Sequence, residues 1–165
     1  MKISRKVYEE LCKITKKHKP NECCCILFKD NSVIEDVTMY AASLSPGHFG
    51  PIKEEVIATL IDKHGIPSSI FHSHPCDAFI SSTDIIYMYP TVVLWKCIWL
   101  VMSDRYELKA FTLTGSKHGI EKRGSTYRPT EVECIISDDP EESFFLKMYK
   151  LQKWLNDSLK EDKND

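Results

Sequence analysis

The chain has 165 residues, the length of one domain with a single hydrophobic core. Its 22 Lys and Arg residues nearly balance 24 Asp and Glu residues, for a formal net charge of −2, so nothing points to nucleic acid as a partner. The longest apolar stretch, 91–102, is interrupted by Lys96 and is too short to span a bilayer. We therefore expect a cytoplasmic protein that does not engage a membrane.

The first half of the chain shows apolar patterns of both helical and strand type. These patterns predict a helix over 3–18, strands over 23–28 and 32–42, a helix over about 53–64 and a strand over 69–73. Pro20 ends the first helix, because proline cannot continue the helical hydrogen-bond ladder. Asp30 and Asn31 supply the turn between the first two strands.

The second half predicts a short helix, three strands and an amphipathic C-terminal helix. The elements are expected over 82–89 (ended by Pro90), 92–102, 107–114 and 130–136, with the last helix starting at Pro140. Trp95 and Trp99 would then face one side of the same strand, in the core or under the C-terminal helix. Because hairpins join most strands and helices are inserted between them, the pattern predicts an α+β fold of the α/β/α sandwich type. A domain over 1–137 would be followed by a helix and charged tail over 138–165.

The seven cysteines do not form a disulfide or zinc pattern. Three are consecutive, at Cys23, Cys24 and Cys25, and there are no CxxC pairs. We expect most of them to be buried thiols in a reducing compartment, whereas Cys76 lies in a loop and is expected to be exposed. Four scattered histidines, at positions 18, 48, 64 and 118, are expected at the surface.

The segment FHSHPCDAFISSTD places His72 and His74 two residues apart at the end of an expected strand. Residues i and i+2 of a strand face the same side, so both imidazoles can reach one ion. A catalytic zinc takes three protein ligands and a water, and Asp84 in the first turn of the next helix is the candidate third ligand. Each feature also has a structural reading: Ser81 and Asp84 match a capping box, and histidines at a strand end can be polar surface.

The combination HSHP at 72–75 and SSTD at 81–84 resembles the signature of the JAMM (MPN+, Mov34/MPN/PAD-1) zinc metalloproteases. In that family a glutamate usually follows a proline by two positions just before the first strand, and Pro20 and Glu22 occupy that place here. The resemblance spans about residues 1–115 and is closest in kind to prokaryotic deubiquitinase-like isopeptidases. It implies the cytidine deaminase-like sandwich of the family, with a mixed, largely antiparallel sheet and here an added C-terminal helix, and it makes 1–137 the catalytic domain.

The resemblance also implies a role for each motif residue. One Zn²⁺ per chain would be bound by His72, His74 and Asp84. Glu22 would accept a proton from the water that the zinc activates and pass it to the leaving amine. Ser81 would donate a hydrogen bond to the oxyanion that forms on the attacked carbonyl.

The loop between the two motifs departs from the family pattern. Five residues separate Pro75 from Ser81, one fewer than is usual in the family. Ser82 could then take the oxyanion role, but Ser81 keeps the SxxD spacing to Asp84 and is the expected donor. A second departure is Cys25, where members often have a glycine or another small residue, and we expect only a packing adjustment there.

The resemblance makes a zinc isopeptidase the leading function. It would cleave after the C-terminal glycine of a ubiquitin-like protein, whose tail would lie extended beside Ser73, Pro75 and Cys76. Two alternatives remain open: a non-catalytic MPN scaffold that binds partners, and a zinc peptidase acting on carrier-protein, phage-tail or cell-wall peptides. Scaffold relatives typically lack one or more metal residues, and this chain lacks none. The sequence sets neither the substrate nor the oligomeric state.

Overall fold

The structure is a computed structural model that describes residues 1–45, 48–115 and 127–138, so the expected C-terminal helix lies outside the described residues. The helices are α1 (Arg5–His18), the 3₁₀ helix η1 (Thr38–Tyr40), α2 (Glu54–His64) and α3 (Ser82–Trp95). The strands are β1 (Lys2–Ser4), β2 (Cys24–Phe28), β3 (Val33–Asp36), β4 (Leu44–Ser45), β5 (His48–Phe49), β6 (Ser69–Ser73), β7 (Ile98–Met102), β8 (Leu108–Thr114), β9 (Arg128–Val132) and β10 (Ile135–Ser137).

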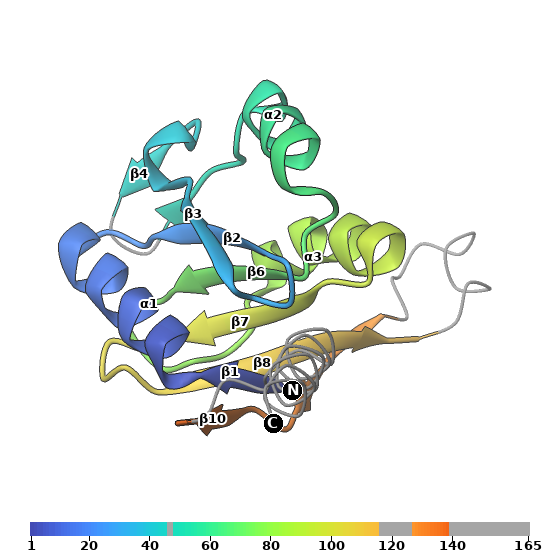
Figure 1. Ribbon diagram of the computed structural model, residues 1–165. Helices are drawn as coiled ribbons and strands as arrows, with labels where there is room; N and C mark the ends of the chain where they lie inside the picture. Colours follow the sequence, from blue (N-terminus) through green and yellow to red (C-terminus); the bar gives the residue numbers. More distant parts are fainter. Residues whose placement is uncertain (46–47, 116–126, 139–165) are drawn as a thin grey trace, which may run out of the picture.

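Six of these strands form the main sheet of the described chain, in the order β3-β2-β6-β7-β8-β9 (Figure 1). Only β6 and β7 run parallel, since α3 connects them as a crossover, and the other neighbouring pairs are antiparallel. Helix α1 packs on one face of this sheet, and α2 and α3 pack on the other. The expected α+β sandwich with a mixed, largely antiparallel sheet is confirmed.

The three consecutive cysteines alternate between the two faces of the sheet. Cys23 and Cys25 pack with α1, whereas Cys24 packs on the face that α2 and α3 cover. Burial raises the pKa of the Cys24 and Cys25 thiols, so both behave as small apolar side chains. All seven cysteines lie in the described part of the chain and are free, and Cys76 is exposed as expected.

Helix α3 continues through Pro90, so the expected helix end at 89 and strand start at 92 are wrong. A proline inside a helix costs about 3 kcal/mol. Val92 and Trp95 pack against the sheet, and burying two large side chains there offsets a cost of that size. Lys96, whose backbone is left-handed with φ 60°, ends the helix.

The prediction that the two tryptophans share a strand is also wrong. Trp95 ends α3, whereas Trp99 lies on β7. The indole N–H of Trp99 donates to Thr91 Oγ1 of α3 at 2.8 Å, which ties the helix to the strand. Both tryptophans therefore lie in the apolar cluster between α3 and the sheet, although they come from different elements.

Three further boundaries differ from the expected ones. The strand expected over 32–42 ends at Asp36, because the chain turns into η1. The strand expected over 130–136 is two strands, of which β10 pairs in parallel with β1 at the start of the chain. The first helix begins at Arg5, where Ser4 caps it by accepting the Val7 N–H at 3.3 Å. Within the described residues, every helix is too short or too polar to cross a membrane.

Candidate metal centre and adjoining pocket

The alternation of β6 determines which way the two histidines face. Ile70 packs on the side of the sheet that α2 and α3 cover, and Phe71 packs toward α1. His72 therefore faces the α3 side. His74 lies one residue beyond the strand, but its N–H donates to the Met102 carbonyl at 2.8 Å and so continues the pairing with β7. Its side chain thus lies on the same side as that of His72, as the sequence predicts.

A capping box places Asp84 at the start of α3. Ser81 is the N-cap, and its Oγ accepts the Asp84 N–H at 3.2 Å. In return, Asp84 Oδ2 accepts the Ser81 N–H at 2.7 Å. The structural reading of this motif is therefore confirmed, and it is compatible with the functional one. The same two hydrogen bonds that start the helix also orient the carboxylate.

Three potential ligand atoms converge between these elements. His72 Nε2 and His74 Nε2 lie 2.7 Å apart. Asp84 Oδ1 lies 3.4 Å from His72 Nε2, and Asp84 Oδ2 lies 3.4 Å from His74 Nε2. Around a tetrahedral zinc with bonds of 2.0–2.1 Å, ligand atoms are separated by about 3.3 Å. The two histidine–aspartate separations match this value, whereas the two imidazole nitrogens would have to move apart by about 0.6 Å to match it. The three residues could thus hold a metal ion, and no other such group occurs among the described residues.

The charge state of this group also suits a divalent cation. Burial raises the pKa of the Asp84 carboxyl, but its hydrogen bonds with His72 and His74 outweigh burial and hold the pKa well below its usual range. The group therefore offers one carboxylate and two imidazoles, a donor set typical of zinc.

Aromatic side chains also flank the two imidazoles. His72 Nδ1 is buried and has no hydrogen-bond partner in the described structure. Its ring stands edge-on to Trp99, with ring centres 5.4 Å apart. The His74 ring stands edge-on to Phe79 of the shortened loop, with ring centres 5.0 Å apart. The loop thus supports a histidine even with one residue fewer.

One pocket brings together the residues expected to do the chemistry. Glu22, His72, Ser81 and Asp84 all line it, and Glu22 is 8% exposed. Ser82, the other candidate for the oxyanion role, is exposed and does not line the pocket.

The three residues expected beside the substrate, Ser73, Pro75 and Cys76, do not line this pocket. The Ser73 hydroxyl accepts the Cys23 N–H at 3.0 Å on the α1 side of the sheet, so its side chain does not reach the pocket. Pro75 and Cys76 are exposed on the loop after His74. The Cys76 carbonyl accepts the Asp104 N–H at 3.0 Å, which ties this loop to the turn after β7.

The pocket has a volume of about 540 Å³ and, outside the candidate site, is mostly apolar. Its floor is the sheet, and its walls are α3 and the segment that leads into α2. The apolar lining residues are Ile26, Phe49, Pro51, Ile52, Ile57, Ile70, Tyr87, Pro90, Leu94, Trp95 and Trp99. The sequence analysis missed this pocket. The sequence does carry a signal for it, because α3 has more apolar residues than one helix face can bury. In the structure, Met88 is the only fully buried residue of α3.

An α/β/α sandwich with two strand-end histidines and a helix-start aspartate defines a domain of the JAB/MPN class with a candidate metal site. The family described as prokaryotic homologs of the JAB domain matches residues 4–114. The chain belongs to this family.

The solved structures that are similar to the chain include the following two. Protein DSY2949 from Desulfitobacterium hafniense superposes with a TM-score of 0.59 at 21% identity, covering 86% of this chain and 96% of that one. AF2198 from Archaeoglobus fulgidus, a JAB1/MPN domain protein, gives a TM-score of 0.46 at 19% identity, with 82% and 98% covered. The first of these supports the fold. Among curated proteins, none matches the chain.

Proposed function

We propose that the protein is a zinc-dependent isopeptidase or peptidase that hydrolyses the bond after the C-terminal glycine of a ubiquitin-like protein. The observation that carries this proposal is the convergence of His72, His74 and Asp84 beside a pocket that Glu22, His72, Ser81 and Asp84 line. Membership of the JAB family supports it, since that family includes metalloproteases. A scaffold would have no need of the complete set.

A bound zinc ion would polarise the substrate carbonyl and make water a stronger nucleophile at neutral pH. Glu22 would take the proton from the attacking water and deliver it to the leaving amine. Its burial suits this role, because a carboxylate removed from solvent interacts more strongly with the reacting groups. Ser81 Oγ accepts the Asp84 N–H, so its own hydroxyl proton is available to the oxyanion.

The pocket favours a substrate with small residues at the scissile bond and a large apolar residue nearby. Glycines at the scissile bond would let the chain approach the metal without a Cβ clash. A few residues away, the apolar part of the pocket would take a bulky aliphatic or aromatic side chain. A flexible tail with terminal glycines and at least one large apolar residue fits both requirements.

The test is a set of fusions that carry different ubiquitin-like proteins on the same leaving group. Zinc-loaded protein should cleave fusions with a terminal glycine pair, and a chelator should abolish cleavage. Cleavage that is equal for tails with and without the glycine pair would redirect the proposal to a general, carrier or cell-wall peptidase. If no fusion and no peptide were cleaved by protein shown to contain zinc, the chain would act as a binding scaffold.

A further inference from the structure

Glu22 lies on a short connection, and hydrogen bonds or ion pairs anchor each of its two ends. Helix α1 ends at His18 and β2 begins at Cys24, so residues 19–23 alone link these elements. A carboxylate that transfers protons must be held at a fixed place relative to the reacting groups. The anchors at the two ends of this connection therefore bear on where Glu22 lies.

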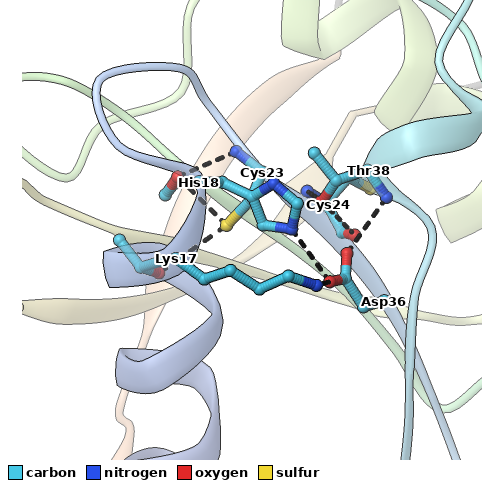
Figure 2. A network of polar contacts seen from close by, with 8 residues as sticks. Lys17, His18, Cys23, Cys24, Asp36 and Thr38 are labelled. Carbon is cyan, nitrogen blue, oxygen red and sulfur yellow. Dashed lines mark hydrogen bonds and ion pairs between the residues drawn. The ribbon is translucent and has the colours of Figure 1, made fainter.

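The first anchor is the carboxylate of Asp36 at the end of β3. Asp36 Oδ2 lies 2.9 Å from His18 Nε2 and 3.1 Å from Lys17 Nζ, and both residues belong to the last turn of α1 (Figure 2). The sequence predicts His18 at the surface, and that prediction is wrong: its side chain is only 7% exposed. A buried, charge-assisted contact of this kind fixes the helix end more firmly than an exposed ion pair does.

The second anchor also leads to Asp36, through Thr38. The other carboxylate oxygen, Asp36 Oδ1, accepts the Thr38 N–H at 3.1 Å. The fully buried Thr38 hydroxyl then accepts the Cys24 N–H at 3.0 Å and lies 3.3 Å from the Cys24 carbonyl. The Cys24 carbonyl also accepts the Val37 N–H at 3.0 Å. One carboxylate thus holds the residue before the connection and, through Thr38, the residue after it.

We propose that Asp36 is a positioning residue for Glu22, because its two oxygens hold the two ends of the connection that carries Glu22. Asp36 does not line the pocket, and its hydrogen-bond partners in the described structure are Lys17, His18 and Thr38 instead of His72, His74 or Asp84. Its effect on the reaction would therefore pass through the placement of Glu22. This inference rests on the proposed function insofar as it names Glu22 as the base.

The neighbouring residue on β3 provides a matched control. Glu35 Oε1 lies 2.6 Å from His64 Nε2 and 3.0 Å from Lys63 Nζ, in the last turn of α2. The contacts are of the same kind as those of Asp36: one carboxylate contacts a lysine and a histidine in the last turn of a helix. Successive residues of a strand point to opposite faces, so Glu35 contacts α2, on the side of the sheet opposite α1. The end of α2 carries no residue expected to do chemistry, so Glu35→Gln breaks an equivalent contact without loosening Glu22.

Kinetics in two backgrounds separate positioning from general stability. Asp36→Asn should lower kcat about 10- to 100-fold, with KM and bound zinc within about twofold of wild type, and Glu35→Gln should leave all three within about twofold. In a Glu22→Gln background, adding Asp36→Asn should change kcat by less than about twofold, because the group that it positions is already gone. An equal loss in both backgrounds, or an equal loss from Glu35→Gln, would overturn the proposal.

Amide hydrogen exchange tests the same proposal without any activity. The Cys24 N–H should exchange about tenfold faster in Asp36→Asn and in Thr38→Val, and should be unchanged in Glu35→Gln. Thr38→Val keeps the side-chain shape and removes only the hydroxyl. If Asp36→Asn fails to fold, this variant still tests whether the Thr38 contact protects the Cys24 N–H. Unchanged Cys24 exchange in both variants would overturn the proposal even for an active enzyme. Faster exchange in a zinc-loaded protein that cleaves nothing would instead count against the proposed function alone.

Discussion

The Nε2 atoms of His72 and His74 lie 2.7 Å apart, and each faces a different oxygen of the Asp84 carboxylate. Both of these nitrogen–oxygen distances are 3.4 Å. At this distance between the two nitrogens, only one hydrogen can lie between them, as in an N–H···N hydrogen bond. A bound metal ion would take its place and accept the lone pairs of both nitrogens. Since metal and protons compete for the same nitrogens, metal binding should weaken as the pH falls.

Glu22→Gln is expected to separate metal binding from turnover. The amide keeps the size of the side chain but cannot act as a base, so kcat should fall by roughly 10²- to 10⁴-fold while bound zinc stays at the wild-type level. Steady-state kinetics and metal analysis of the same preparation check this. Full activity in the variant would place the general base elsewhere.

Ser81 and Ser82 should behave differently, because Ser81 alone lines the pocket and caps α3. Ser81→Ala should lower kcat by about 10²- to 10³-fold with little change in KM, and should cost about 1 kcal/mol in unfolding free energy for the lost cap. Ser82→Ala should leave both quantities nearly unchanged. Ser81→Asn, which keeps a capping oxygen, should restore stability but not the wild-type rate. A larger kinetic loss in Ser82→Ala than in Ser81→Ala would show that the shortened loop has moved the oxyanion donor.

The apolar pocket can be tested with two equally exposed residues of α3. Leu94 lines the pocket and is 71% exposed, whereas Ile86 is 70% exposed and does not line it. Leu94→Ala should raise KM several-fold for a substrate with a large apolar residue near the scissile bond, since a buried methylene contributes about 0.8 kcal/mol. Ile86→Ala should not change KM. Equal KM values for the two variants would place the apolar part of the substrate outside this pocket.

Asp36 should contribute stability that is lost in acid. Burial raises the pKa of its carboxyl, but hydrogen bonds with His18, Thr38 and Lys17 outweigh burial and lower it from 3.8 to about 2. A carboxyl whose pKa is lower in the folded state stabilises the protein above its unfolded value, and this stability is lost as the pH falls through the folded value. Between pH 4 and pH 2 the wild type should lose about 1–2 kcal/mol of unfolding free energy that Asp36→Asn does not lose. Denaturant titrations across this window measure the difference, and parallel curves for the two proteins would contradict it.

The placement of the three candidate metal ligands could be predicted from the sequence, because local rules determine it. Two residues at i and i+2 on a strand must share a face, and SxxD at a helix start forms a capping box in this structure. Glu22 needed the family resemblance, since no local rule brings a residue just past α1 to the end of β6.

The features that the sequence did not predict depend on contacts between distant segments. Burial of Val92 and Trp95 against the sheet carries α3 past Pro90, and local helix propensity alone predicts a stop there. The pocket combines residues from four separate stretches of the chain, 22–26, 49–57, 70–72 and 81–99. The contacts of Asp36 join residues 17–18, 36 and 38, so neither the burial of His18 nor the end of β3 at Asp36 could be read from a local pattern.

The central claim is that His72, His74 and Asp84 bind a metal ion, and calorimetric titration of zinc into chelator-treated protein tests it most directly. We expect one zinc per wild-type chain, no saturable binding to His74→Ala, and wild-type stoichiometry for Glu22→Gln, because Glu22 is not a ligand. Wild-type protein that remains folded after chelation and binds no zinc at neutral pH would contradict the account.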